Sequence, residues 1–112
     1  MKLLLSSMLI LAAGCGGAQT LQTDSSSAAI RAAEEVGAGK VPRASLHLQL
    51  AKEEMDRAQK LAKAGEKDQA TSYLLRAEAD AEFAVVLARE DSEKNEAAQA
   101  VERVRLLQQE NR

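Results

Sequence analysis

Apolar residues recur in the middle of the chain at alternating intervals of three and four. They are Leu48, Ala51, Met55, Ala58 and Ala62 in one segment, then Ala70, Leu74, Ala77, Ala81, Ala84 and Ala88 in the next. This spacing places each set on one face of an α-helix. Gly65 is expected to end the first helix and Asp68 to cap the second. Two helices of matched length joined by a short turn predict an antiparallel αα-hairpin, with its core over about 43–88.

Large side chains of one predicted helix face small ones of the other. Counted outward from the turn, Leu48 lies near Ala84 and Ala51 lies near Ala81. Alanine at so many of these levels lets the two backbones approach near the lower end of the usual range of about 8–10 Å between helix axes. The stripe is therefore interpreted as packing, and no cofactor-binding residue is assigned to it.

A second apolar stripe lies on the side of the later helix that faces away from the hairpin partner. Its members are Leu75, Ala79, Phe83, Val86, Ala97, Val101 and Val104. Two alternatives remain open for these seven residues. The stripe is a surface for self-association or for a protein partner, or a short helix over 28–36 folds back over most of it and leaves a monomer.

The segments that flank the hairpin complete an all-α prediction. The short helix over 28–36 begins behind three serines, any of which could cap it, and Gly37 supplies a left-handed stop. Pro42 suits the first turn of the next helix. The segment 89–96 has no apolar residue. Beyond it we expect a projecting, coiled-coil-like helix, with a disordered tail as the alternative for 97–112. The helical domain then covers 28–112.

The N-terminus has the organisation of a bacterial export signal. Lys2 supplies the positive charge, an apolar run extends over 3–11, and small residues precede the only cysteine, Cys15. The run is shorter than the roughly 20 residues that a membrane-spanning helix needs. The sequence "LAAGC" resembles the lipobox of bacterial lipoproteins, which implies a signal peptide over 1–14 and a lipid-modified Cys15. Residues 15–27 then form the lipidated start and a flexible tether, and Gly16 favours the outer membrane, facing the periplasm.

Composition and charge argue against several other classes of function. The 15 basic and 17 acidic residues give a net charge of −2 and are interspersed, so no nucleic-acid partner is expected. His47 is the only histidine and has no neighbouring metal ligand in the sequence. Glu53 and Glu54, like Asp80 and Glu82, face different sides of their own helix. We therefore expect no catalytic residue, no metal, no cofactor and no enzyme activity.

The stretch from Ala28 to about Ala88 resembles the domain of unknown function family 4398 (DUF4398). The resemblance lies in the order of a short Ala-rich helix, a linker with Gly37, Ala38 and Pro42, a turn at Gly65 and an alanine-heptad helix. Further matching positions are Leu46, Ala51, Met55, Ala58, Ala70, Ala77 and Ala81. The resemblance implies an envelope lipoprotein, in a family sometimes joined to peptidoglycan-binding domains of the OmpA type. It assigns no activity to any residue.

Together these features predict a lipid-anchored envelope protein that works by interaction or as a scaffold. Two other functions remain open. One is a structural spacer that contacts peptidoglycan noncovalently, and the other is a small helical periplasmic chaperone or adaptor.

Overall fold

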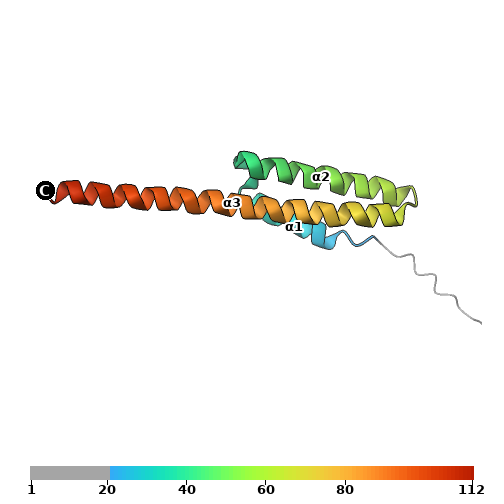
Figure 1. The fold of residues 1–112 in the computed structure, drawn as a ribbon. Coiled ribbons are helices and arrows are strands. Elements are labelled where there is room, and N and C mark those ends of the chain that lie inside the picture. The colour runs from blue at the N-terminus through green and yellow to red at the C-terminus, as the bar shows by residue number, and fades with distance from the viewer. Residues whose placement is uncertain (1–20) are drawn as a thin grey trace, which may run out of the picture.

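The computed structural model describes residues 21–112, and every regular element in that range is a helix (Figure 1). The elements are α1 (Asp24–Glu35), a single 3₁₀ turn η1 (Ala38–Lys40), α2 (Pro42–Lys63) and α3 (Lys67–Glu110). The first half of α3 lies antiparallel to α2, and its second half continues alone (Figure 1). This confirms the predicted hairpin with a long projecting helix. The predicted signal peptide, Cys15 and most of the predicted tether lie outside the described residues.

Glycine and proline set the helix boundaries as predicted. Gly65 has φ +84°, in the left-handed region that favours glycine. Its N–H donates to the Ala62 carbonyl at 3.1 Å, and the Glu66 N–H donates to the Leu61 carbonyl at 2.9 Å, so α2 ends in a Schellman motif. Gly37 has φ +78° after α1, and Pro42 occupies the first turn of α2.

The core between α2 and α3 is built mainly from alanine. The predicted positions Ala51, Ala58, Ala77, Ala81 and Ala84 are fully buried. Leu48 and Leu74 are the larger residues among them, at 6% and 5% exposed. The small side chains let the two backbones approach closely, which confirms the predicted packing faces.

The first helix begins earlier than expected. It starts at Asp24 rather than Ala28, so the last four residues of the predicted tether are helical. The serines do not cap it, because Thr23 holds the N-cap position without a side-chain hydrogen bond. Ser26 is instead buried, and its hydroxyl donates to the Leu74 carbonyl of α3 at 2.9 Å. A contact between helices, which local propensity does not reveal, extends α1.

Asp68 does not cap α3, and that prediction is wrong. The N-cap position is Glu66, which makes no side-chain cap hydrogen bond, and the helix begins at Lys67. The Schellman motif shortens the turn, so Asp68 falls inside the first helical turn. Its negative charge there still stabilises the helix, because it lies near the positive end of the helix dipole.

α1 packs into one of the two grooves between α2 and α3. Ala33 shares a buried cluster with Leu48, Ala84 and Ala88, while Ser26 reaches Leu74, so α1 runs in the same direction as α3. Lys52 of α2 pairs with Glu34 of α1 at 2.5 Å. The three helices therefore form a small bundle, and the opposite groove between α2 and α3 stays open.

The second half of α3, residues 89–110, projects from this bundle and is called the arm below. Ala88 is the last buried residue of α3, and all residues from Arg89 onward are exposed. At 1.5 Å per residue the arm is about 33 Å long. The arm is helical, so the alternative of a disordered tail is wrong. Within residues 21–112, no helix has the length and apolar character needed to cross a membrane.

Candidate functional site

The second apolar stripe, called the outer stripe below, is exposed along the whole of α3. It consists of the seven predicted residues Leu75, Ala79, Phe83, Val86, Ala97, Val101 and Val104. Its large members range from 43% exposed at Phe83 to 70% at Val101. α1 packs against the adjacent side of α3 and does not cover it. The structure therefore leaves the stripe in solvent, as the first of the two alternatives requires.

The outer stripe repeats itself between the bundle and the arm. Ala79 and Ala97, Phe83 and Val101, and Val86 and Val104 are each separated by 18 residues. Eighteen residues make five turns of an α-helix, so each pair points in the same direction from the axis. The apolar-free segment 89–96 separates the two copies of the pattern. One straight helix thus carries the same small apolar surface twice.

A shallow crevice runs beside the bundle half of this stripe, between α1 and α3. It has a volume of about 650 Å³. α1 contributes small side chains to it, and α3 contributes two carboxylates and two valines: Ser25, Ala28, Ala29, Ala32, Glu78, Glu82, Val85 and Val86. Because Val86 belongs both to the crevice and to the outer stripe, the two form one continuous apolar surface.

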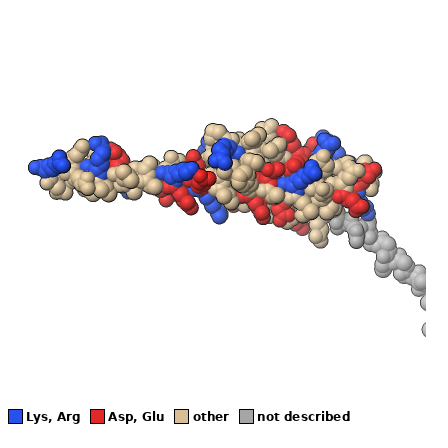
Figure 2. Space-filling model, in the orientation of Figure 1, with Lys and Arg blue, Asp and Glu red and all other residues tan. Residues whose placement is uncertain are grey.

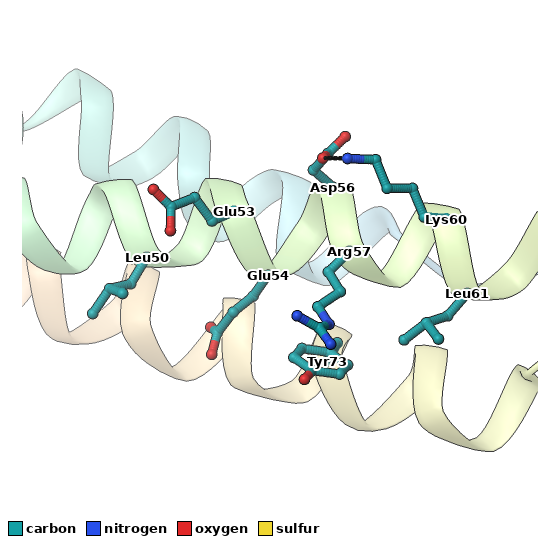
Figure 3. Close-up of a pocket in the computed structure, with 8 residues that line it drawn as sticks. All are labelled: Leu50, Glu53, Glu54, Asp56, Arg57, Lys60, Leu61 and Tyr73. Atoms are coloured by element: carbon teal, nitrogen blue, oxygen red, sulfur yellow. Dashed lines mark ion pairs between the residues drawn. The ribbon is translucent and has the colours of Figure 1, made fainter.

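A different groove lies on the other side of the hairpin, between α2 and α3. It has a volume of about 560 Å³. Figure 3 shows Glu54, Arg57 and Leu61 of α2 directed toward α3, while Glu53, Asp56 and Lys60 point away. This groove mixes apolar and charged groups, unlike the outer stripe. Its position opposite α1 makes it the second open surface of the bundle.

Tyr73 lines this groove, and Phe83 makes a second aromatic contact between α2 and α3. The guanidinium groups of Arg57 and Arg76 lie 5.1 and 5.2 Å from the ring centre of Tyr73, the only tyrosine. Figure 3 shows the Arg57 side chain against this ring. Phe83, the only phenylalanine, meets the edge of the His47 ring with 4.6 Å between ring centres. The Arg57–Tyr73 and His47–Phe83 contacts each join α2 to α3, whereas Arg76 approaches Tyr73 from the next turn of the same helix.

Three titratable groups from the two helices come together next to Phe83. His47 Nδ1 lies 2.7 Å from Asp80 Oδ1, with both side chains 26% exposed. Glu54 lies close to Asp80, and its Oε2 atom is buried without a hydrogen-bond partner. Burial first, and then the Asp80 carboxylate, raise the pKa of Glu54, whereas Arg76 acts in the opposite direction.

Helix-by-helix inspection of the sequence missed this arrangement. Glu54 faces a different direction from Glu53, and Asp80 from Glu82. The hairpin nevertheless brings Glu54 and Asp80 toward each other. The available signal was the predicted antiparallel register, which places residue 54 of α2 near residue 80 of α3. Within residues 21–112, no group of three or more His, Cys, Asp or Glu side chains is arranged to hold a metal ion. The His47–Asp80 contact in this cluster joins α2 to α3.

Charge is mixed over the surface. Figure 2 shows basic and acidic groups alternating along the drawn face, and uncharged surface in the middle of the arm between charged groups at either end. The arm itself holds ion pairs between Lys94 and Glu90 at 2.5 Å and between Arg105 and Glu102 at 2.7 Å. No broad region of one sign is present on this face. The outer stripe is thus the most distinctive exposed surface of the described residues.

Comparison with known proteins adds one match. The model of the family described as "Domain of unknown function (DUF4398)" matches residues 21–100, which include the bundle and the first half of the arm. No curated protein and no solved structure matches the chain.

Proposed function

The chain belongs to the DUF4398 family, and we propose that it is a lipid-anchored protein of the bacterial envelope that works by protein interaction. In this proposal it has no catalytic activity. It faces the periplasm, most simply from the outer membrane, and it presents the arm and the outer stripe to a partner protein or to another copy of itself.

One observation supports the interaction role above all others. The arm is helical although none of its residues is buried, and beyond the polar segment 89–96 it repeats the exposed apolar stripe of the bundle. Exposed apolar stripes of this extent on a helix mark surfaces that other molecules cover. Most helical stability in proteins comes from packing of an apolar face, so contact with another chain would stabilise the arm.

The anchoring role depends on the N-terminal sequence. Lys2, the apolar run over 3–11 and the small residues before Cys15 have the organisation of a lipoprotein signal. One acyl chain binds a membrane weakly, whereas the several chains of a mature lipoprotein bind it durably. The fold places the start of α1 and the arm at opposite ends of the bundle. α1 enters beside Leu74, in the part of α3 nearer the hairpin turn, and the arm extends the opposite way (Figure 1). A single anchored copy would therefore hold its arm away from the membrane.

Metabolic labelling tests the anchor. Cells that express the chain are supplied with labelled palmitate, and the labelled protein is compared with Cys15→Ser and with the matched control Gly16→Ser. We expect label and membrane sedimentation for the unchanged chain and for Gly16→Ser. We expect no label on Cys15→Ser, because Cys15 is the only cysteine and modification of its thiol precedes cleavage and acylation of the new amino terminus. Mass spectrometry of the N-terminal peptide separates an uncleaved signal from an acylated start. Label that persists on Cys15→Ser would refute the lipid anchor.

A second candidate function follows from the length of α3. Its 44 residues make a rod of about 66 Å, which suits a spacer that contacts peptidoglycan noncovalently. Sedimentation with purified peptidoglycan tests this role. Under the spacer hypothesis, the full chain cosediments and a variant with Ala98→Pro in the arm cosediments less. The same amount of cosedimentation for both would show that the arm does not make the contact.

A further inference from the structure

We infer that α3 pairs with α3 of a second copy of this chain, antiparallel and through the outer stripe. This deepens the proposed interaction role by naming the partner, and it does not depend on the lipid anchor. A closed dimer of identical chains needs a surface that is complementary to itself under a two-fold rotation. The outer stripe has that property.

The repeat along α3 creates the self-complementarity. In an antiparallel pair whose two-fold axis passes close to Glu90, residues whose numbers add to about 181 lie at the same level. Ala79 then meets Val101 of the other copy, and Phe83 meets Ala97. The bundle half of each stripe covers the arm half of the other. The same axis lies near the midpoint of α3 (Lys67–Glu110), so the two helices overlap over almost their entire length.

Charges beside the stripe favour the same register. On the side of α3 that carries α1, Glu78 comes level with Arg103 of the other copy, and Arg89 comes level with Glu93. Each of these opposite-charge pairs occurs twice because of the symmetry.

Two like-charge contacts in this register are already neutralised within each copy. Glu90 approaches the Glu90 of the other copy at the axis, but Lys94 of its own helix pairs with it at 2.5 Å. On the other side Arg76 and Arg105 come level, and the Arg105 charge is matched by Glu102 of its own helix at 2.7 Å. The apolar-free segment 89–96 therefore lies at the centre of the antiparallel pair, where its charges can fix the register.

The available area is sufficient for a stable dimer. Leu107 is 57% exposed, like most large members of the stripe, and it extends the apolar surface toward the tip of the arm. With these fractions, the stripe and its flank expose on the order of 650 Å² per copy, so complete coverage in a dimer would bury about 1,300 Å², near the lower end of the usual range of specific interfaces. Within residues 21–112, the arm buries none of its residues against the rest of the chain.

The crevice between α1 and α3 is filled in the same arrangement. Ala100 and Leu107 lie on the side of α3 that faces α1, by the 100° rotation per residue of an α-helix. In the antiparallel pair they come level with the α1 segment of the other copy. Ala28, Ala29 and Ala32 offer small side chains there, so the incoming helix can approach closely. The arm of one copy thus becomes the fourth helix of the other copy's bundle.

The pairing determines where the two N-terminal segments leave the assembly. Ser26 lies beside Leu74, and residue 74 of one copy comes level with residue 107 of the other. The two α1 helices then start about 50 Å apart along the rod, from 33 residues at 1.5 Å each. If both copies are anchored by lipid, the dimer lies along one membrane surface or connects two surfaces, instead of standing upright.

Cysteine crosslinking tests the pairing and its direction. The full chain carries Cys15→Ser, so that an introduced cysteine is the only thiol, and a short bismaleimide is added. We expect Glu90→Cys to crosslink to itself. Ala79→Cys alone and Val101→Cys alone should give no product, because their copies lie about 33 Å apart in the antiparallel pair. A mixture of the two should give a dimer. Self-crosslinking of Ala79→Cys would instead show a parallel pair and overturn the inference.

Sedimentation equilibrium supplies a matched control. Val86 and Leu46 are 57% and 56% exposed, but Val86 lies on the outer stripe and Leu46 lies on α2. In the same Cys15→Ser background, Val86→Asp should weaken dimerisation at least tenfold and Leu46→Asp should change it less than twofold. Circular dichroism checks that both remain folded. A monomer at all concentrations, or equal effects of the two variants, would overturn the inference. Loss of lipid label at Cys15 would affect only the anchor proposal.

Discussion

The two halves of α3 have the same length and opposite environments. Residues 67–88 lie against α2 and α1, and seven of them are buried: Ala70, Leu74, Ala77, Ala81, Ala84, Leu87 and Ala88. Residues 89–110 bury none. Continuity of the helix across residue 88 therefore does not reflect a continuous core. The first half is stabilised by packing, and the second half depends on local interactions or on another chain.

Local interactions are more regular in the arm than in the bundle half. Lys94 pairs with Glu90 four residues earlier, and Arg105 pairs with Glu102 through two hydrogen bonds at 2.7 and 2.8 Å. Asn95 also donates to Asp91 at 3.1 Å. Exposed pairs of this kind each contribute little, because water screens them. They are enough to favour the helix but too weak to replace a core, which is why the outer stripe matters for the arm.

The same substitution should have very different effects in the two halves. Ala81→Leu introduces a large side chain into the contact between α2 and α3, where Ala81 is fully buried. Overpacking a tight core costs about 3 kcal/mol at the upper end of its usual range. We expect the free energy of unfolding to fall by about that amount, measured by urea denaturation.

Ala98→Leu is the matched control in the arm. Ala98 is exposed and lies off the outer stripe, and leucine and alanine have similar helix propensities. Its free energy of unfolding should change by less than about 0.5 kcal/mol. Equal losses for the two variants would mean that the alanines of the bundle are not needed for close approach.

The hydroxyl of Ser26 should contribute to the bundle half only. Ser26→Ala removes the buried donor to the Leu74 carbonyl, and a buried hydrogen bond of this kind contributes about 1 kcal/mol. Ser25→Ala is the control, because Ser25 makes an exposed hydrogen bond to Glu78 at 3.1 Å. Thermal unfolding should show a lower midpoint for Ser26→Ala than for Ser25→Ala. The reverse order would argue against the observed docking of α1.

A glycine in the arm should loosen the arm without affecting the bundle. Ala98→Gly costs about 0.8 kcal/mol of helix stability, which corresponds to roughly fourfold faster opening. Hydrogen exchange, measured at a concentration where the chain is monomeric, should therefore accelerate for amides in 89–110 and stay unchanged for 70–88. Uniform acceleration over both segments would show that the two halves unfold as one unit.

The sequence was sufficient to predict the hairpin and its packing faces. Intervals of three and four are a direct consequence of helical geometry, and Gly37, Pro42 and Gly65 mark boundaries for steric reasons that act within a few residues. The end of the core near Ala88 followed from the loss of apolar residues in 89–96. These features depend on local chemistry, and all of them are present in the structure.

The features that were missed depend on contacts between helices. Ser26 is a polar residue in a serine run, and its burial becomes favourable only because Leu74 offers a carbonyl. His47 appeared isolated, but the antiparallel register brings Asp80 to it, and the same register brings Arg57 of α2 to the Tyr73 ring of α3. Asp68 was misassigned because a tighter turn moved the start of α3. Such details require the relative position of two helices to within about one residue.

Acidity should affect the two halves in opposite directions. In the bundle, burial and Asp80 raise the pKa of Glu54, so the folded chain binds this proton more tightly than the unfolded chain. Stability from Glu54 is therefore lost as the pH rises through its raised pKa. In the arm, Lys94 lowers the pKa of Glu90 and Arg105 lowers that of Glu102. Their contribution is present above the unfolded pKa and is lost as the pH falls through the lowered values.

Glu54→Gln isolates the bundle effect. At neutral pH it should raise the free energy of unfolding by a few tenths of a kcal/mol, because Glu54 is partly exposed and water screens its repulsion from Asp80. Near pH 3 the gain should vanish, since the wild-type carboxyl is then protonated as well. Glu53→Gln is the control, because Glu53 points away from α3 (Figure 3). Urea denaturation at both pH values measures the difference. An equal gain at both pH values would show that packing, and not charge repulsion from Asp80, accounts for the effect of Glu54→Gln.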